Sequence, residues 1–136
     1  MNREILFRGK RTDNGEWIDG ALFPSSDGMP LICNSIAAGT PIDETAMCIA
    51  CNVDPDTVGE FTGLTDKNGK RIWEGDVVEF DAYGLHYKGV VSFIDGNFCV
   101  MCNRPAASPF LDSAIKQHDA VCIGNIHDNP ELMEGE

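Results

Sequence analysis

The chain has 136 residues, of which 43% are hydrophobic and 24% charged, so it is long enough to bury a core and shows no compositional sign of disorder. Its net charge of −12, from 22 acidic and 10 basic residues, opposes binding to phosphate backbones and to anionic membranes. The sequence contains neither a run of about 20 apolar residues that could span a bilayer nor a signal-peptide core, so we expect a cytoplasmic protein with reduced cysteines.

The first part of the chain predicts short strands joined by tight turns. Asn14-Gly15 is typical of a type I′ hairpin turn between two strands. Residues 24–30 have the composition of a loop, and the fold of residues 24–46 as a whole stays open because no regular pattern runs through them. The predicted strands of this part cover residues 3–8, 16–23, 31–33 and 46–53.

The rest of the chain continues this pattern and adds helix. Asp95-Gly96 predicts a two-residue hairpin. Ser108-Pro109 has the form of an N-cap followed by proline at the first helical position, which predicts a short amphipathic helix, and Asn129-Pro130 predicts a terminal helical turn in the same way. The predicted strands cover residues 57–64, 77–83, 87–94, 97–102 and 120–126, and residues 71–73 lead into a turn at 74–76. About eight short strands with one or two short helices indicate a mainly β, β-rich α+β fold, and favour a small barrel or sandwich.

Three parts of the chain combine glycines, aspartates and aromatic residues in a distinctive order: residues 3–9 with Trp17 behind them, residues 53–78, and residues 123–132. Together they resemble the YopX family of phage and prophage proteins. The resemblance implies a single domain over residues 1–136, with an N-terminal β lobe at 1–60, an SH3-like barrel at 61–128 and a short helical tail at 129–136. It also implies a phage or prophage origin in a bacterial cell, and it carries over no catalytic residues.

The residues that carry this resemblance are more typical of turns than of catalytic or binding sites. Glycine permits backbone shapes that are closed to other residues, and aspartate and asparagine favour turns. We therefore interpret the motif as architecture. Its members are Gly59, Gly63, Asp66, Gly69, Gly75, Asp76, Gly124, Asn125, Asn129 and Pro130.

Two Cys-x-x-Cys pairs, Cys48 with Cys51 and Cys99 with Cys102, have the spacing of zinc-binding pairs. Both pairs lie in apolar, strand-like runs, and residues three apart on a strand face opposite sides. We therefore interpret these residues as core cysteines and expect no metal and no other cofactor. A zinc site is the alternative, and it requires the two pairs to converge.

Charged residues of two kinds are candidates for contact with a partner. Glu79 and Asp81 share one face of a predicted strand, and His86 lies at a hairpin tip, where loops carry binding sites. A solvated face is the simpler interpretation of the two acids, with a divalent-cation or basic-partner site as the alternative. The basic candidates are Arg8, Lys10 and Arg11 near the start of the chain.

The sequence contains no nucleophile elbow, phosphate-binding loop or dinucleotide fingerprint, so we do not expect an enzyme. We expect a non-enzymatic phage accessory protein that acts by contact with another protein, with a homo-oligomer as a further candidate. A nucleic-acid-associated role through the basic N-terminal edge is the first alternative, although the acidic net charge disfavours it. A small metal-dependent enzyme that uses the acids or the cysteines is the second.

Overall fold

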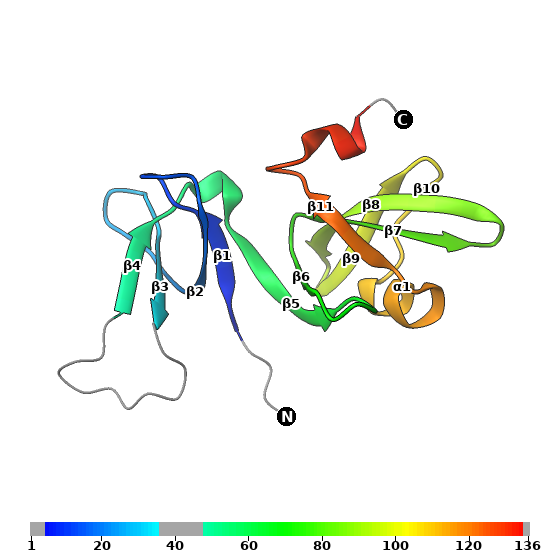
Figure 1. The fold of residues 1–136 in the computed structure, drawn as a ribbon, viewed down its shortest axis with the longest axis horizontal. Coiled ribbons are helices and arrows are strands. Elements are labelled where there is room, and N and C mark those ends of the chain that lie inside the picture. Colours follow the sequence, from blue (N-terminus) through cyan, green and yellow to red (C-terminus); the bar gives the residue numbers. More distant parts are fainter. Residues whose placement is uncertain (1–4, 36–47, 135–136) are drawn as a thin grey trace. The chain divides into compact units, whose positions relative to one another are not determined.

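The computed structural model describes residues 5–35 and 48–134, and the chain divides into two compact units, Met1–Glu60 and Phe61–Glu136. Both units consist mainly of antiparallel strands (Figure 1), which confirms the predicted mainly β fold class. Among the described residues, no helix has the length and apolar character needed to cross a membrane.

The first unit is an antiparallel meander with a small core. Its strands are β1 (Phe7–Lys10), β2 (Trp17–Phe23), β3 (Leu31–Ser35) and β4 (Cys48–Asn52), followed by the 3₁₀ turn η1 (Pro55–Thr57). The start of β5 (Gly59–Thr65) pairs with β1 on the side opposite β2. Ile18, Ile32 and Val53 form the buried core of this unit.

The turn between β1 and β2 differs from the predicted type I′ hairpin. Gly15 has a φ of +74°, but Asn14 does not share a positive φ, and a type I′ turn requires both. The loop is wider because the N–H of Thr12 donates to the carbonyl of Asn52 in β4 at 3.0 Å, which takes Thr12 out of the β1–β2 ladder. Arg11 closes this loop by donating from its N–H to Glu16 O at 2.9 Å.

The second unit holds a five-stranded antiparallel sheet in the order β10-β9-β8-β7-β11. Before this sheet the unit contains residues 61–65 of β5 and the strand β6 (Arg71–Trp73), which pairs with β5. The sheet consists of β7 (Asp76–Ala82), β8 (Leu85–Ile94), β9 (Asn97–Asn103), β10 (Ala106–Ala107) and β11 (Val121–Asn125). One helix, α1 (Leu111–His118), precedes β11, and a 3₁₀ turn, η2 (Pro130–Met133), follows it.

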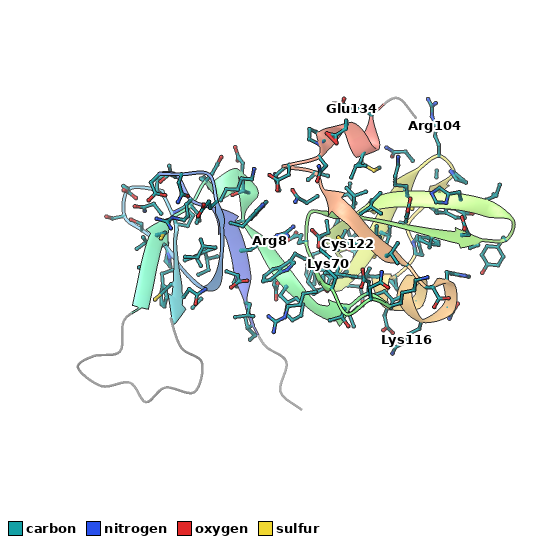
Figure 2. The ribbon with its side chains drawn as sticks, viewed as in Figure 1. Arg8, Lys70, Arg104, Lys116, Cys122 and Glu134 are labelled. Carbon is teal, nitrogen blue, oxygen red and sulfur yellow. The ribbon has the colours of Figure 1, made fainter. Side chains whose placement is uncertain are left out.

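This sheet is not closed into the SH3-like barrel that the sequence resemblance implies. At one edge, β10 has only 2 residues. At the other edge, the N–H of Cys122 in β11 donates to the carboxylate of Asp66 at 3.1 Å, and the N–H of Lys70 donates to the same carboxylate at 3.0 Å. Lys70 and Cys122 are both labelled in Figure 2. The outer side of β11 is therefore bonded to a turn, and the ladder ends there.

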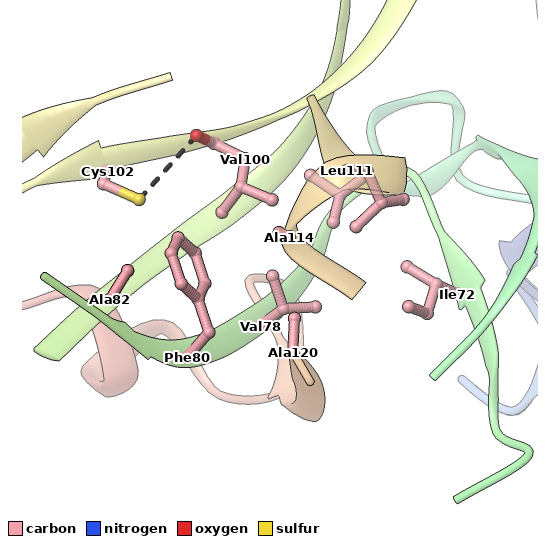
Figure 3. Packing of buried hydrophobic residues seen from close by; sticks show 10 residues of the cluster. Ile72, Val78, Phe80, Ala82, Val100, Cys102, Leu111, Ala114 and Ala120 are labelled. Carbon is pink, nitrogen blue, oxygen red and sulfur yellow. Dashed lines mark hydrogen bonds between the residues drawn. The ribbon is translucent and has the colours of Figure 1, made fainter. Parts of the chain in front are cut away.

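The core of the second unit lies between this sheet and α1 (Figure 3). Leu111 and Ala114 are fully buried on one side of the helix, and they pack with sheet residues such as Val78 and Val100. Alternation along β7 places Val78 and Phe80 in this core and turns Glu79 and Asp81 to the opposite face. The same alternation therefore positions the two acids that the sequence indicated for partner contact.

The helix begins later than the Ser108-Pro109 pair predicts. Its N-cap residue is Phe110, with φ −64° and ψ 138° and no side-chain cap hydrogen bond. The residues before it are extended because Pro109 accepts a hydrogen bond from the N–H of Val100 at 2.9 Å and Phe110 forms a bridge with Cys99. Pairing with β9 thus competes successfully with the capping signal.

Two type I′ turns shape the long hairpins of this unit. Asp95 and Gly96 both have positive φ, of 51° and 85°, between the paired residues Ile94 and Asn97, which confirms the predicted two-residue hairpin. The turn between β7 and β8 has the same form at Tyr83-Gly84, with φ values of 53° and 77°. The predicted strand at residues 77–83 is therefore one residue too long, since β7 ends at Ala82 and Tyr83 lies in the turn.

Candidate functional site

The hairpin of β7 and β8 brings together three of the residues singled out from the sequence. His86 lies within β8 rather than at the hairpin tip where the sequence indicated it, because Tyr83 and Gly84 form the turn. It is the direct cross-strand partner of Asp81. The ring of His86 lies between two carboxylates, with Nδ1 at 2.7 Å from Asp81 Oδ1 and Nε2 at 3.2 Å from Glu79 Oε2. All three side chains are accessible, since that of His86 is 57% exposed and that of Asp81 is 83% exposed.

These contacts change the protonation of the histidine. The hydrogen bond with Asp81 raises the pKa of His86 above its ordinary value, and the negative charges of Asp81 and Glu79 act in the same direction. Desolvation opposes the shift but does not cancel it. The imidazole is therefore protonated over a wider pH range than an isolated histidine.

A cavity of about 440 Å³ opens beside these residues, and we call it the β7 groove. Lys67, Phe80 and Val121 form part of its lining. Three of its polar residues come from the β7–β8 hairpin and three from the end of α1 and the residue after it: Glu79, Asp81, His86, Gln117, His118 and Asp119.

A second hollow of about 320 Å³ adjoins the β7 groove, since both are lined by Phe80, Gln117 and His118. Its walls are largely aromatic. Phe80 stacks on His118 with ring centroids 5.7 Å apart, and Tyr83 meets the same imidazole edge-on at 5.6 Å. Tyr83 is 86% exposed and Phe110 is 55% exposed. We call this the aromatic hollow.

Comparison with known proteins places the chain. The family model described as YopX protein matches residues 6–134. The chain belongs to the YopX family. This confirms the resemblance drawn from the three motif segments.

One solved structure gives a further comparison for this YopX chain. It is similar to the protein in the crystal structure of protein EF1440 from Enterococcus faecalis, with 26% identity, a TM-score of 0.55, and coverage of 98% of this chain and 100% of the other. A comparison with curated proteins finds no match. The family and the fold are therefore fixed, and the role of the site has to come from its own chemistry.

The residues of the YopX motif lie in turns, bulges and buried bonds. Asp66, 5% exposed, accepts hydrogen bonds from three backbone N–H groups through its two carboxylate oxygens. Asp76, 2% exposed, accepts one from the N–H of Trp73 at 2.8 Å. Gly63, Gly69 and Gly75 have φ values between +83° and +94°. Gly59 opens β5 and is buried.

The C-terminal part of the motif joins β11 to η2. The N–H of Asn125 donates to Asn129 Oδ1 at 3.3 Å. A Cβ added to Gly124 would lie 2.6 Å from that same oxygen, so only glycine leaves room for it. Pro130 occupies the first turn of η2, although Asn129 makes no side-chain cap bond.

The basic N-terminal edge is folded onto its own unit. Arg8 and Lys10 both lie over the ring of Trp17, with their charged groups 4.5 Å and 5.5 Å from its centroid. Arg11 forms a salt bridge with Asp13 at 2.7 Å. These contacts engage all three basic candidates within the first unit.

The cysteines do not form a metal centre in the part of the chain that the structure describes, where no group of three or more His, Cys, Asp or Glu residues could hold an ion. Cys99 and Cys102 are buried free thiols on β9, and desolvation raises the pKa of the Cys102 thiol. Cys51 is also free, and the side chain of Cys48 lies outside the described residues. Cys33 is disulfide-bonded, which differs from the expectation of six reduced cysteines.

Sequence reasoning identified Glu79, Asp81 and His86 but missed the other half of the site. His118 and Asp119 follow from the position of α1 beside β7, which no local pattern reports. Gly84 carried a usable signal for the turn that exposes Tyr83, because a glycine between two strands favours a tight hairpin.

Proposed function

We propose that this YopX protein is a non-enzymatic phage or prophage accessory protein that acts in the host cytoplasm by binding another protein through the β7 groove and the aromatic hollow. The observation that carries the proposal is the pairing of two kinds of surface. The exposed carboxylate of Asp81 and the half-buried carboxylate of Glu79 border the groove, and the exposed rings of Tyr83 and Phe110 border the hollow beside it. Aromatic anchors next to polar rims are characteristic of protein-binding surfaces.

The charge of the groove favours a basic segment of the partner. Three carboxylates, those of Glu79, Asp81 and Asp119, line it. Two basic side chains face them, Lys67 and the imidazole of His86, which contacts Glu79 and Asp81. The net charge of −12 on the whole chain adds a long-range attraction for basic surfaces. The same field opposes nucleic acid, and the basic edge offered for it is already in contact with Trp17 and Asp13.

The chemistry of the groove gives little support to an enzyme. Among the described residues that line it, none is a serine, threonine or cysteine, the usual hydroxyl and thiol nucleophiles. His86 is held by two carboxylates on an open surface, where the high dielectric constant of water weakens their electrostatic field. These features favour recognition over catalysis.

The test is a quantitative affinity capture from host lysate with three baits: the wild type, the double variant Glu79→Gln/Asp81→Asn, and the control Asp56→Asn/Glu131→Gln. The control removes the same charge from exposed positions that do not line the groove. We expect a partner that the wild type and the control retain, that the groove variant loses, and that elutes as salt rises. A lysate from which the wild type retains no protein at low salt, or a partner held equally by all three baits, would refute the proposal.

A further inference from the structure

The end of β7 extends beyond its neighbour in the sheet. β11 pairs with β7 only from Asp76 to Glu79, where Val121 is the last partner. β7 itself continues to Ala82. Before Val121 the chain leads back into α1, so among the described residues the β7 groove, rather than another strand, lies beside this end of β7.

The backbone of Asp81 faces this groove. Tyr83-Gly84 is a two-residue turn, which makes Ala82 and Leu85 a hydrogen-bonded pair. Bonded and non-bonded pairs alternate in an antiparallel ladder, so Asp81 and His86 form a non-bonded pair. The N–H and C=O of Asp81 therefore point away from β8, toward the side of the groove.

The pairing of β7 with β11 independently gives the same direction for the backbone groups of Asp81. The N–H of Cys122 donates to Asp66, away from β7, so Cys122 and Val78 are a non-bonded pair and Glu79 turns its backbone toward β11. Asp81 is two residues further along the strand and has the same orientation. Its backbone groups are thus placed to continue the ladder past the end of β11.

We infer that the β7 groove binds an extended, basic and apolar peptide segment of a partner protein, which adds to the sheet as a strand beside Asp81. The inference rests on the proposed function and specifies its binding mode and the chemistry of its ligand. Main-chain hydrogen bonds to Asp81 supply the affinity that is independent of sequence, as in other cases of strand addition. The groove sits where β11 would otherwise continue.

Alternation of side chains along the added strand sets its composition. On one face of the sheet the peptide meets Glu79 and Asp81, which favour lysine or arginine. On the other face it meets Phe80 and the aromatic hollow with Tyr83 and Phe110, which favour apolar or aromatic residues. The ligand is therefore a segment in which basic and apolar residues alternate.

The test uses the intact protein and three synthetic peptides of the same sequence, with lysine alternating with valine and phenylalanine. One peptide is unmodified, and the other two carry N-methyl groups on alternate backbone amides, one peptide for each of the two registers. Binding is followed by ¹⁵N NMR at low salt, through the amide signals of Asp81 and His86. We expect the unmodified peptide to shift the Asp81 amide, and N-methylation in one register to weaken binding about tenfold, because it removes a backbone hydrogen bond.

Two substitutions at Asp81 separate the effect of its charge from that of its backbone N–H. Asp81→Asn removes the charge and keeps the N–H, so it weakens the salt-dependent part of binding. Asp81→Pro removes the N–H as well, at an edge position that tolerates proline, and abolishes binding. Retained secondary structure in both variants, measured by circular dichroism, shows that folding is not the cause.

Three results would overturn strand addition: no binding of the unmodified peptide at low salt, equal affinity for the methylated peptides, or an Asp81 amide that shifts with protein concentration alone. The last would assign the edge to a second copy of the chain. A lysate partner lost by Glu79→Gln/Asp81→Asn, together with equal affinity for the peptides, would leave the proposed function standing and remove only the binding mode.

Discussion

The buried carboxylate of Asp66 joins the turn after β5 to the edge strand β11, because its Oδ2 accepts a hydrogen bond from the backbone N–H of Cys122 at 3.1 Å. The other oxygen accepts from the N–H groups of Asn68 and Lys70 at 2.9 and 3.0 Å. One side chain thus satisfies three backbone donors and links segments separated by 56 residues in sequence. Asp66 is therefore a residue that stabilises the second unit, and not a candidate catalytic residue.

The substitution Asp66→Asn tests this role. The amide NH₂ of asparagine cannot accept a hydrogen bond, so at least one buried N–H loses its acceptor, and we expect a loss of about 2 kcal/mol in the free energy of unfolding. The control is Asp27→Asn, at an exposed turn whose carboxylate accepts from the N–H of Met29 through one oxygen. Urea unfolding at neutral pH should show less than about 0.5 kcal/mol for the control. Equal losses would contradict the assignment.

The same carboxylate predicts a pH dependence of stability. Burial acts to raise the pKa of Asp66, but the hydrogen bonds from Cys122, Lys70 and Asn68 together lower it below the ordinary value of 3.8. A lowered pKa in the folded state means that the stabilisation is present above pH 3.8 and is lost as pH falls through the folded-state value. As pH falls below 5, the free energy of unfolding should therefore decrease less steeply for Asp66→Asn than for the wild type. Parallel curves would show that other groups carry the acid sensitivity.

The titration of His86 supplies a further prediction. The wild-type imidazole should titrate above 6.5, and Asp81→Asn should return its pKa toward that value, because Asp81 is the largest cause of the shift. With a raised folded-state pKa, the stabilisation is complete below pH 6.5 and is lost as pH rises through the folded-state value. NMR titration of the ring protons measures the shift directly. Glu79→Gln is the comparison variant, and a larger effect from it than from Asp81→Asn would contradict the geometry.

Gly124 and Asn129 should be energetically coupled. A Cβ at position 124 would lie 2.6 Å from Asn129 Oδ1 and 2.8 Å from Leu132 Cδ1, so Gly124→Ala should cost about 2 kcal/mol. Asn129→Ala removes the first of these atoms. In a double-mutant cycle by urea unfolding, Gly124→Ala should therefore cost less in the Asn129→Ala background than in the wild type. Additive costs would mean that the contact with Asn129 does not decide the residue at position 124.

The parts of the fold that were predictable are those set by local rules. Asp95-Gly96 fixed the β8–β9 hairpin because both residues accept positive φ, and alternation on β7 correctly placed Glu79 and Asp81 on one face. The start of α1 was mispredicted because Phe110 bridges to Cys99 in β9, a contact that no local signal reports. The open sheet likewise depends on the long-range bond between Asp66 and Cys122.

The candidate site divides in the same way. Asp81 and His86 are near in sequence and share one hairpin, so their meeting follows from local structure. The groove itself requires the end of α1 to lie beside β7, with His118 against Phe80. That arrangement arises from packing of the core, and no local pattern in the sequence indicates it.

A substitution at Tyr83 can distinguish a role in binding from a role in stability. It holds a φ of 53°, where asparagine is far better suited, and its ring is 86% exposed, so the backbone at this turn is strained for little gain in burial. Residues kept in strained conformations are often there for binding. We expect Tyr83→Asn to leave the free energy of unfolding unchanged within about 1 kcal/mol, since relief of the turn offsets the lost edge contact with His118.

The same variant should lose affinity for the alternating peptide and for the captured partner, because the aromatic hollow loses its most exposed wall. The control is Asp95→Asn, which places asparagine at the corresponding position of the β8–β9 turn without removing an aromatic ring. Urea unfolding and peptide titration of both variants decide the matter. A destabilised Tyr83→Asn that binds as tightly as the wild type would make this tyrosine a structural residue and move the binding surface away from the hollow.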